Sequence, residues 1–202
     1  MVCCMTLFQL TEILTTTTLT GFHTPEKTLI TSINTDTRNL QPGEGFLALR
    51  GNNFDGHNFV DEAIEKGASC VIVEQEYTLN SEIQQLSNNI PILQVENTLK
   101  AYQKIARWWR DRFDIPVISV TGSIGKTTTK ELIAEVLATQ GKVMKTEANY
   151  NNEIGVAKTL LRLSDKDNYA VVEMAMRGPG EIAELTHIAN PTIGLITNVG
   201  TA

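Results

Sequence analysis

A short stretch near the middle of the chain combines two glycines, a lysine and several hydroxyl side chains in an order that suits phosphate binding. It reads Thr-Gly-Ser-Ile-Gly-Lys-Thr-Thr over residues 121–128. Between a strand and a helix, such a stretch can bind phosphate, because the N-terminus of a helix presents unpaired backbone N–H groups and the positive end of its dipole. We therefore expect Lys126 to reach the outer phosphates of a ligand and the Thr127 hydroxyl to contact Mg²⁺.

The flanking residues supply both elements. Residues 117–120 form an apolar, β-branched run that predicts a buried strand, and residues 131–138 have helical periodicity. The spacing is not that of the strict phosphate-binding loop, since Val120 stands where that pattern has its first glycine. The alternative is an ordinary strand–turn–helix connection with a surface lysine. The order of strand, glycines, Lys-Thr and helix favours the phosphate loop.

A carboxylate lies near the end of another predicted strand, residues 169–174. Burying Glu173 there without a partner would be costly. Ligands of open α/β sheets gather at the carboxyl ends of the strands, where a Mg²⁺ held together with Thr127 would compensate the charge. We prefer this metal site to the alternative, a salt bridge from Glu173 to Arg177, because a phosphate loop needs an acidic partner for its cation.

Three asparagines, at positions 149, 151 and 152, stand just before a predicted helix over residues 155–163. They form a loop that could hydrogen-bond a ligand. Asparagine also favours turns and helix caps, and on composition alone the two interpretations are equally good.

Composition sets outer limits on the function. The chain has 202 residues, of which 42% are hydrophobic and 20% charged, as is typical of a globular protein with one or two domains. A net charge of −6 argues against broad binding to nucleic acid or to an anionic membrane. Cys3, Cys4 and Cys70 have neither zinc-site nor disulfide spacing, and no apolar run could span a bilayer. Since the start also lacks a signal-peptide pattern, we expect a cytoplasmic protein without stable membrane insertion.

Strand and helix patterns alternate along the chain, which predicts an α/β fold. The expected helices cover residues 7–14, 59–66, 81–87, 99–113, 131–138 and 155–163, and the expected strands cover 29–34, 46–49, 70–73, 92–95, 117–120, 142–145, 169–174 and 192–198. We expect two domains: a small N-terminal α/β domain over residues 1–97, and part of a P-loop-type central domain over residues 98–202.

Together these features resemble the Mur ligase family. The resemblance rests on residues 121–128, 149–155, Glu173 and 197–202, and residues 36–38 and 51–59 are similar to the family's first domain, which holds the UDP end of the substrate. It covers nearly the whole chain. Within the family, the combination is closest to the member that adds D-alanyl-D-alanine to a UDP-N-acetylmuramoyl tripeptide; the members that add diaminopimelate or lysine are the nearest alternatives.

The resemblance implies an ATP-dependent amide ligase of peptidoglycan precursor synthesis. ATP phosphorylates the terminal carboxylate of the tripeptide, and the amine of D-alanyl-D-alanine then attacks the acyl phosphate. Lys126 and Glu173 are implied as catalytic residues, and Thr127 and Glu173 as Mg²⁺ ligands. The residues implied to bind ATP are Thr121, Gly122, Ser123, Ile124, Gly125, Lys126, Thr127 and Thr128. Those implied to bind the UDP-linked substrate are Asp36, Thr37, Arg38, Asp55, Gly56, His57, Asn149, Asn151 and Asn152.

Two features depart from the family pattern. Ala157 stands where the family usually has proline, a change that a loop tolerates. The chain ends at Ala202, where the family continues with a histidine, the rest of the ATP-binding domain and a C-terminal domain. We therefore expect an N-terminal part of a ligase that by itself has no ligase turnover. The alternative from a different class is a non-catalytic module that binds a nucleotide or a UDP-sugar.

Overall fold

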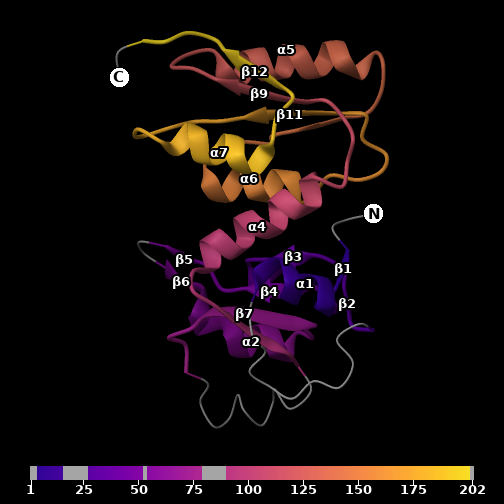
Figure 1. Ribbon diagram of the computed structural model, residues 1–202, viewed down its shortest axis with the longest axis vertical. Helices are drawn as coiled ribbons and strands as arrows, with labels where there is room; N and C mark the ends of the chain where they lie inside the picture. Colours follow the sequence, from indigo (N-terminus) through magenta and orange to yellow (C-terminus); the bar gives the residue numbers. More distant parts are fainter. Residues whose placement is uncertain (1–3, 16–26, 52–53, 79–89, 201–202) are drawn as a thin grey trace. The chain divides into compact units, whose positions relative to one another are not determined.

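The computed structural model describes residues 4–15, 27–51, 54–78 and 90–200. The chain divides into two compact units, an N-terminal unit of residues 2–105 and a C-terminal unit of residues 106–202. The division falls inside helix α4 (Thr98–Arg110) (Figure 1). The predicted domain boundary, between residues 97 and 98, lies at the start of the same helix and stays a prediction.

The N-terminal unit is built on a parallel four-stranded sheet in the order β3-β4-β7-β8. Its strands are β3 (Ile33–Asn34), β4 (Gly45–Leu47), β7 (Cys70–Glu74) and β8 (Ile92–Val95). Helix α2 (Val60–Glu65) packs its apolar residues with Phe46, Val71 and Val73 in one buried cluster. Because the strands are parallel, their carboxyl ends meet at one edge of the sheet, where ligands of α/β proteins gather.

Short elements complete this unit. Strands β1 (Met5–Thr6) and β2 (Leu29–Ile30) pair antiparallel, as do β5 (Arg50–Gly51) and β6 (Phe54–Asp55). Helix α1 (Leu7–Leu14) begins with a capping box between Thr6 and Gln9. It is followed by Thr15, whose backbone adopts the left-handed conformation that ends many helices. Two 3-10 helices, η1 (Thr37–Asn39) and η2 (Gly56–Phe59), contain or adjoin the substrate residues predicted in this unit.

The C-terminal unit has a second parallel sheet, in the order β10-β11-β9-β12. Its strands are β9 (Val117–Thr121), β10 (Val143–Lys145), β11 (Tyr169–Glu173) and β12 (Ile193–Ile196). Helix α5 (Lys126–Ala138) lies on one side of the sheet, and α6 (Glu153–Leu160) and α7 (Glu181–Ala189) lie on the other (Figure 1). The register pairs Glu173 of β11 with Val120 of β9, so this carboxylate stands next to the start of the predicted phosphate loop.

The helices are short, and the two longest given above, α4 and α5, have 13 residues each. The end of α4 belongs to the C-terminal unit, where the buried Arg110 donates to the carbonyl oxygens of Ala189 and Asn190 at the end of α7. These carbonyl groups have no partner within their helix, so the guanidinium satisfies them. Across the described ranges, no helix combines the length and the apolar character needed to cross a membrane.

The fold confirms the predicted α/β class, and both four-stranded sheets are parallel. The predicted strand over residues 29–34 is wrong in one respect, because it consists of two short strands: β2 pairs with β1, whereas β3 pairs with β4. Helices α5 and α6 begin earlier than predicted, at Lys126 and Glu153, directly after the residues that cap them. The predicted helix over residues 81–87 lies outside the described residues.

Candidate functional site

The connection between β9 and α5 is a glycine turn that leads directly into a helix. Gly122 and Gly125 have φ of 137° and 85°, in the region that favours glycine. Lys126 is the first residue of α5, so the turn ends where the unpaired N–H groups of the helix begin. The Lys126 Nζ donates to the Gly122 carbonyl oxygen at 2.7 Å, which holds the ammonium against the turn. An anion seated here would meet backbone N–H groups and a lysine together.

A second segment, residues 197–200, holds this turn in place. The Thr197 Oγ1 donates to the Ile124 carbonyl oxygen at 2.7 Å, and the Asn198 Oδ1 accepts from the Ile124 N–H at 2.9 Å. The Ser123 N–H donates to the Asn198 carbonyl oxygen at 3.3 Å. Neither Thr197 nor Asn198 was among the predicted site residues, although their segment carried part of the family resemblance. Their contacts brace the loop on the side of β12, which pairs with β9.

Glu173, the last residue of β11, is buried beside the start of α5, with its side chain 3% exposed. The Thr127 Oγ1 donates to Glu173 Oε2 at 2.9 Å, and the Asn151 amide donates to Oε1 at 2.8 Å. The predicted proximity of Thr127 and Glu173 is therefore present. Among the described residues, the ion-pair partner of Glu173 is Lys130, at 3.9 Å, and not the Arg177 considered as the alternative.

The Thr127 hydroxyl and the Glu173 carboxylate fit the predicted Mg²⁺ ligands. Mg²⁺ binds oxygen atoms octahedrally at about 2.1 Å, so that neighbouring ligand atoms lie about 3 Å apart. The separation of Thr127 Oγ1 and Glu173 Oε2, 2.9 Å, matches this spacing. Within the described ranges, no three His, Cys, Asp or Glu side chains come together as a metal site. A Mg²⁺ held by one hydroxyl and one carboxylate would take its other ligands from water and phosphate.

The three asparagines before α6 differ in what they contact. Asn151 holds Glu173, as described above. Asn152 is the N-cap of α6, because its Oδ1 accepts from the Gly155 N–H at 2.9 Å. Asn149 is exposed, and its carbonyl oxygen accepts from the Asn151 N–H at 2.8 Å. The loop is thus part helix cap and part support for Glu173, and a contact with substrate stays a prediction.

Replacing Asn152 with alanine should lower the free energy of unfolding by about 1 kcal/mol, because α6 would lose the side-chain cap of the Gly155 N–H. Urea unfolding followed by circular dichroism measures this change. Asn149→Ala is the matched control: that side chain is exposed, and its loss should change the stability by less than about 0.5 kcal/mol. Equal losses in the two variants would argue against the capping role.

In the N-terminal unit, Asp36, Thr37 and Arg38 follow the carboxyl end of β3. Asp36 caps η1 by accepting from the Arg38 N–H at 3.0 Å, and its carboxylate also binds the guanidinium, with Nη2 at 2.6 Å. The hydrogen bond between the two side chains and the negative charge of Asp36 raise the pKa of the Arg38 guanidinium above its usual value. The Arg38 side chain is 83% exposed, whereas Thr37 is buried. A permanently charged, exposed guanidinium held at the ligand-binding edge of a sheet suits recognition of phosphate.

Asp55, Gly56 and His57 form a tight turn beside β7. The Asp55 Oδ1 accepts from the His57 N–H at 3.0 Å and lies 2.6 Å from the ring Nδ1, while the ring Nε2 accepts from the Glu74 N–H at 3.0 Å. Burial alone would raise the pKa of Asp55, but the hydrogen bonds from His57 and Arg50 lower it below its usual value. A Cβ on Gly56 would lie 2.7 Å from a neighbouring carbonyl oxygen. These residues therefore fix the turn, and their contact with substrate stays a prediction.

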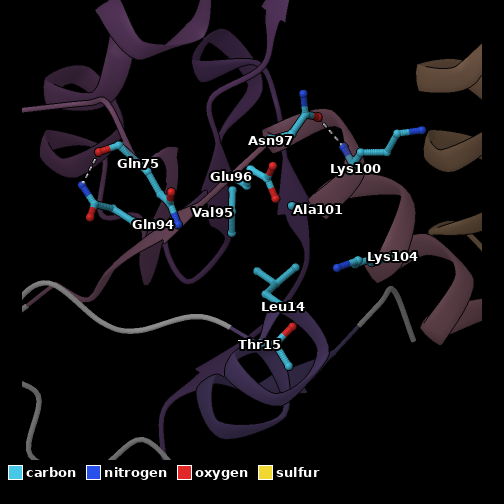
Figure 2. Close-up of a pocket in the computed structure, with 10 residues that line it drawn as sticks. All are labelled: Leu14, Thr15, Gln75, Gln94, Val95, Glu96, Asn97, Lys100, Ala101 and Lys104. Atoms are coloured by element: carbon cyan, nitrogen blue, oxygen red, sulfur yellow. Dashed lines mark hydrogen bonds between the residues drawn. The ribbon is translucent and has the colours of Figure 1, made fainter.

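The N-terminal unit also contains a pocket of about 560 Å³ (Figure 2). Its lining residues are Leu14, Thr15, Gln75, Gln94, Val95, Glu96, Asn97, Lys100, Ala101 and Lys104. They come from α1, the ends of β7 and β8, and the first turns of α4, so no single stretch of sequence indicated the pocket. None of the six substrate residues predicted in this unit, all of which the structure describes, is among them.

Comparison with known proteins assigns both regions to one family. Residues 29–110 match the family model described as "Mur ligase family, catalytic domain", and residues 120–202 match "Mur ligase middle domain". Among curated relatives, the UDP-N-acetylmuramoyl-tripeptide--D-alanyl-D-alanine ligase of Synechocystis sp. is 54% identical over 198 residues, which cover 98% of this chain and 42% of that protein.

Solved structures give the same result. A crystal structure of MurF from Acinetobacter baumannii is 34% identical, with a TM-score of 0.86, and the match covers 100% of this chain and 42% of that one. MurF ligase from Thermotoga maritima in complex with ADP is 37% identical, with a TM-score of 0.74, and the match covers 85% of this chain and 38% of that one. The chain thus spans well under half the length of each of these proteins.

The two matched regions and the loop geometry agree with one another. The glycine turn with Lys126, the Thr127–Glu173 pair and the bracing residues Thr197 and Asn198 all lie within the middle-domain match. Asp36 to Arg38 and Asp55 to His57 lie within the other match. The chain therefore belongs to the Mur ligase family.

Proposed function

We propose that this chain is part of an ATP-dependent ligase that joins D-alanyl-D-alanine to a UDP-N-acetylmuramoyl tripeptide in peptidoglycan precursor synthesis, in the cytoplasm. The observation that supports this most is the 54% identity, over nearly the whole chain, to a ligase of that name. Since the chain spans 42% of that protein, the complete activity belongs to the proposal. In the same proposal, residues 1–97 form the substrate domain and residues 98–202 part of the ATP-binding domain.

ATP would bind in the turn between β9 and α5. The backbone N–H groups of residues 122–128 and the Lys126 ammonium would hold the β- and γ-phosphates. Thr127 and Glu173, 2.9 Å apart, would hold Mg²⁺, which when bound neutralises phosphate charge. The bracing contacts from Thr197 and Asn198 support this assignment, because a rigid loop loses less entropy when the ligand binds.

The proposed reaction activates a poor electrophile. An oxygen of the tripeptide's terminal carboxylate attacks the γ-phosphorus and ADP leaves. The amine of D-alanyl-D-alanine then attacks the acyl carbon, inorganic phosphate leaves, and the amine gives up a proton. Residues of this chain would contribute by positioning the phosphates and by neutralising their charge, which are the main requirements of phosphoryl transfer.

The UDP end of the tripeptide substrate would bind in the N-terminal unit, with Arg38 as its phosphate contact. Arg38 suits this role because it is exposed, charged and already oriented by Asp36. The Arg38 guanidinium has five N–H donors, so phosphate would either displace the Asp36 carboxylate or bind to donors that Asp36 does not use.

Replacing Arg38 with alanine should weaken binding of the UDP-N-acetylmuramoyl tripeptide about tenfold, through loss of a charge-assisted hydrogen bond to phosphate. Isothermal titration calorimetry on the full chain measures the change. Arg162→Ala is the matched control, because Arg162 is also partly exposed and paired with an acid, Glu147, but belongs to the C-terminal unit. Unchanged affinity in Arg38→Ala, or an equal loss in the control, would contradict the assignment of Arg38.

A further inference from the structure

Lys130 is a lysine whose side chain is buried in the C-terminal unit. It lies on α5, one turn after Lys126, and it is 1% exposed. Lysine is almost never fully buried unless it is paired. Its Nζ donates to the Thr146 carbonyl oxygen at 2.9 Å, lies 2.9 Å from the Glu131 carboxylate, and lies 3.9 Å from Glu173 Oε2.

Lys130 and Thr127 approach the same carboxylate oxygen. They are three residues apart on α5, so they share one face of the helix. The Thr127 hydroxyl reaches Glu173 Oε2 at 2.9 Å, and the Lys130 ammonium stands 3.9 Å from the same atom. Asn151 holds the other oxygen, Oε1, at 2.8 Å. Helix α5 and the loop before α6 thereby fix the orientation of the Glu173 side chain, at the end of β11.

The position of the ammonium is itself fixed from two sides. Besides the Thr146 carbonyl oxygen, the Glu131 carboxylate binds it, and Glu131 is in turn paired with Lys145. Thr146 also contacts the backbone of Glu173, because its Oγ1 accepts from the Glu173 N–H at 3.0 Å. Lys130 therefore belongs to the framework that surrounds Glu173, and it supplies the positive charge there.

We propose that Lys130 is a positioning residue for the cation site. Its positive charge compensates the Glu173 carboxylate and keeps that carboxylate beside Thr127, where Mg²⁺ would bind. This role rests on the proposed function, because it assumes that Thr127 and Glu173 hold the Mg²⁺ of a bound nucleotide. A buried carboxylate without a counter-charge is strongly unfavourable. Without Lys130 the side chain would turn away from its buried position, and the oxygen that the cation needs would be misplaced.

The test compares ATP affinity with and without Mg²⁺ in the full chain. The ratio of the two dissociation constants gives the magnesium enhancement of binding. In Lys130→Met the enhancement should fall at least tenfold, while the affinity for metal-free ATP stays within about threefold of the wild-type value. A purely structural role would instead lower both affinities together, since a damaged fold would weaken binding of the phosphates as well as of the cation.

Lys142→Met is the matched control, because Lys142 lies in the same unit but is 58% exposed and pairs with Asp167, which is not part of the framework around Glu173. This variant should keep the wild-type enhancement. If Lys130→Met does not fold, as shown by its thermal unfolding curve, Lys130→Arg decides instead; it retains the charge and should keep the enhancement to within about threefold.

The outcomes separate the two proposals. If the wild-type chain shows magnesium enhancement and Lys130→Met keeps it, or loses metal-free affinity by the same factor, the role of Lys130 is refuted and the nucleotide site stands. Loss of enhancement in Lys130→Arg refutes the role as well. If the wild-type chain binds no ATP at all, the proposed nucleotide site fails, and the role of Lys130 fails with it.

Discussion

Replacing Lys126 with methionine is expected to weaken Mg-ATP binding to this chain about 100-fold, equivalent to about 2.7 kcal/mol. The ammonium lies against the glycine turn, 2.7 Å from the Gly122 carbonyl oxygen, where the outer phosphates of the nucleotide would bind. Methionine keeps the length of the aliphatic chain but brings no charge, so a charge-assisted contact to phosphate is lost. Isothermal titration calorimetry with Mg-ATP measures the loss.

Lys142→Met provides the comparison for this result. Both variants replace a lysine with methionine, so they change the net charge by the same amount. Lys142, however, is 58% exposed and pairs with Asp167 at 2.9 Å. Its ATP affinity should stay within about twofold of the wild-type value, since exposed charges are strongly screened. A loss below tenfold in Lys126→Met, or a similar loss in both variants, would show that Lys126 is not the phosphate contact.

Replacing Gly122 with alanine is expected to cost about 3 kcal/mol of folding stability and to abolish measurable ATP binding. The added Cβ would lie 2.1 Å from Thr197 Oγ1 and 3.0 Å from the Asn198 nitrogen, so the Thr197 side chain or the loop must move. The φ of 137° adds a conformational penalty for any side chain. Urea unfolding gives the stability change, and calorimetry gives the affinity.

Gly125→Ala separates crowding from backbone conformation. Gly125 also has a positive φ, 85°, but a Cβ there would meet no atom within 4 Å. Its replacement should therefore cost only the conformational penalty, about 1 kcal/mol. If the two variants lose the same stability, the close approach of Thr197 is not what requires glycine at position 122.

The sequence predicts the loop well because the signals for it are local. A β-branched run, two glycines, Lys-Thr and a helical pattern follow one another within about twenty residues, and each constrains its neighbours. Glu173 was also found from sequence, because a carboxylate in an apolar strand needs a partner. Its proximity to Thr127 followed from the parallel sheet, in which β9 and β11 end at the same edge.

The sequence did not reveal residues whose contacts lie far away along the chain, or whose burial is unusual for their residue type. Lysine is almost never fully buried, and only the fold shows that the Lys130 ammonium is buried beside Glu173. Asn198 supports Ile124 from 74 positions away along the chain, a contact that no local pattern encodes. No local pattern encodes the partner of the His57 Nε2 either, the N–H of Glu74, and the predicted contact of His57 with substrate stays a prediction.

The central proposal, one nucleotide site in the C-terminal unit and one UDP-substrate site in the N-terminal unit, is tested most directly by a single calorimetric series. The chain is titrated with UDP-N-acetylmuramoyl tripeptide, with plain UDP for comparison, first alone and then after saturation with Mg-ATP. The two-site assignment predicts one tripeptide bound per chain in both conditions, since ATP occupies a different site. Competition between tripeptide and ATP, or ATP binding without any binding of UDP compounds, would contradict it.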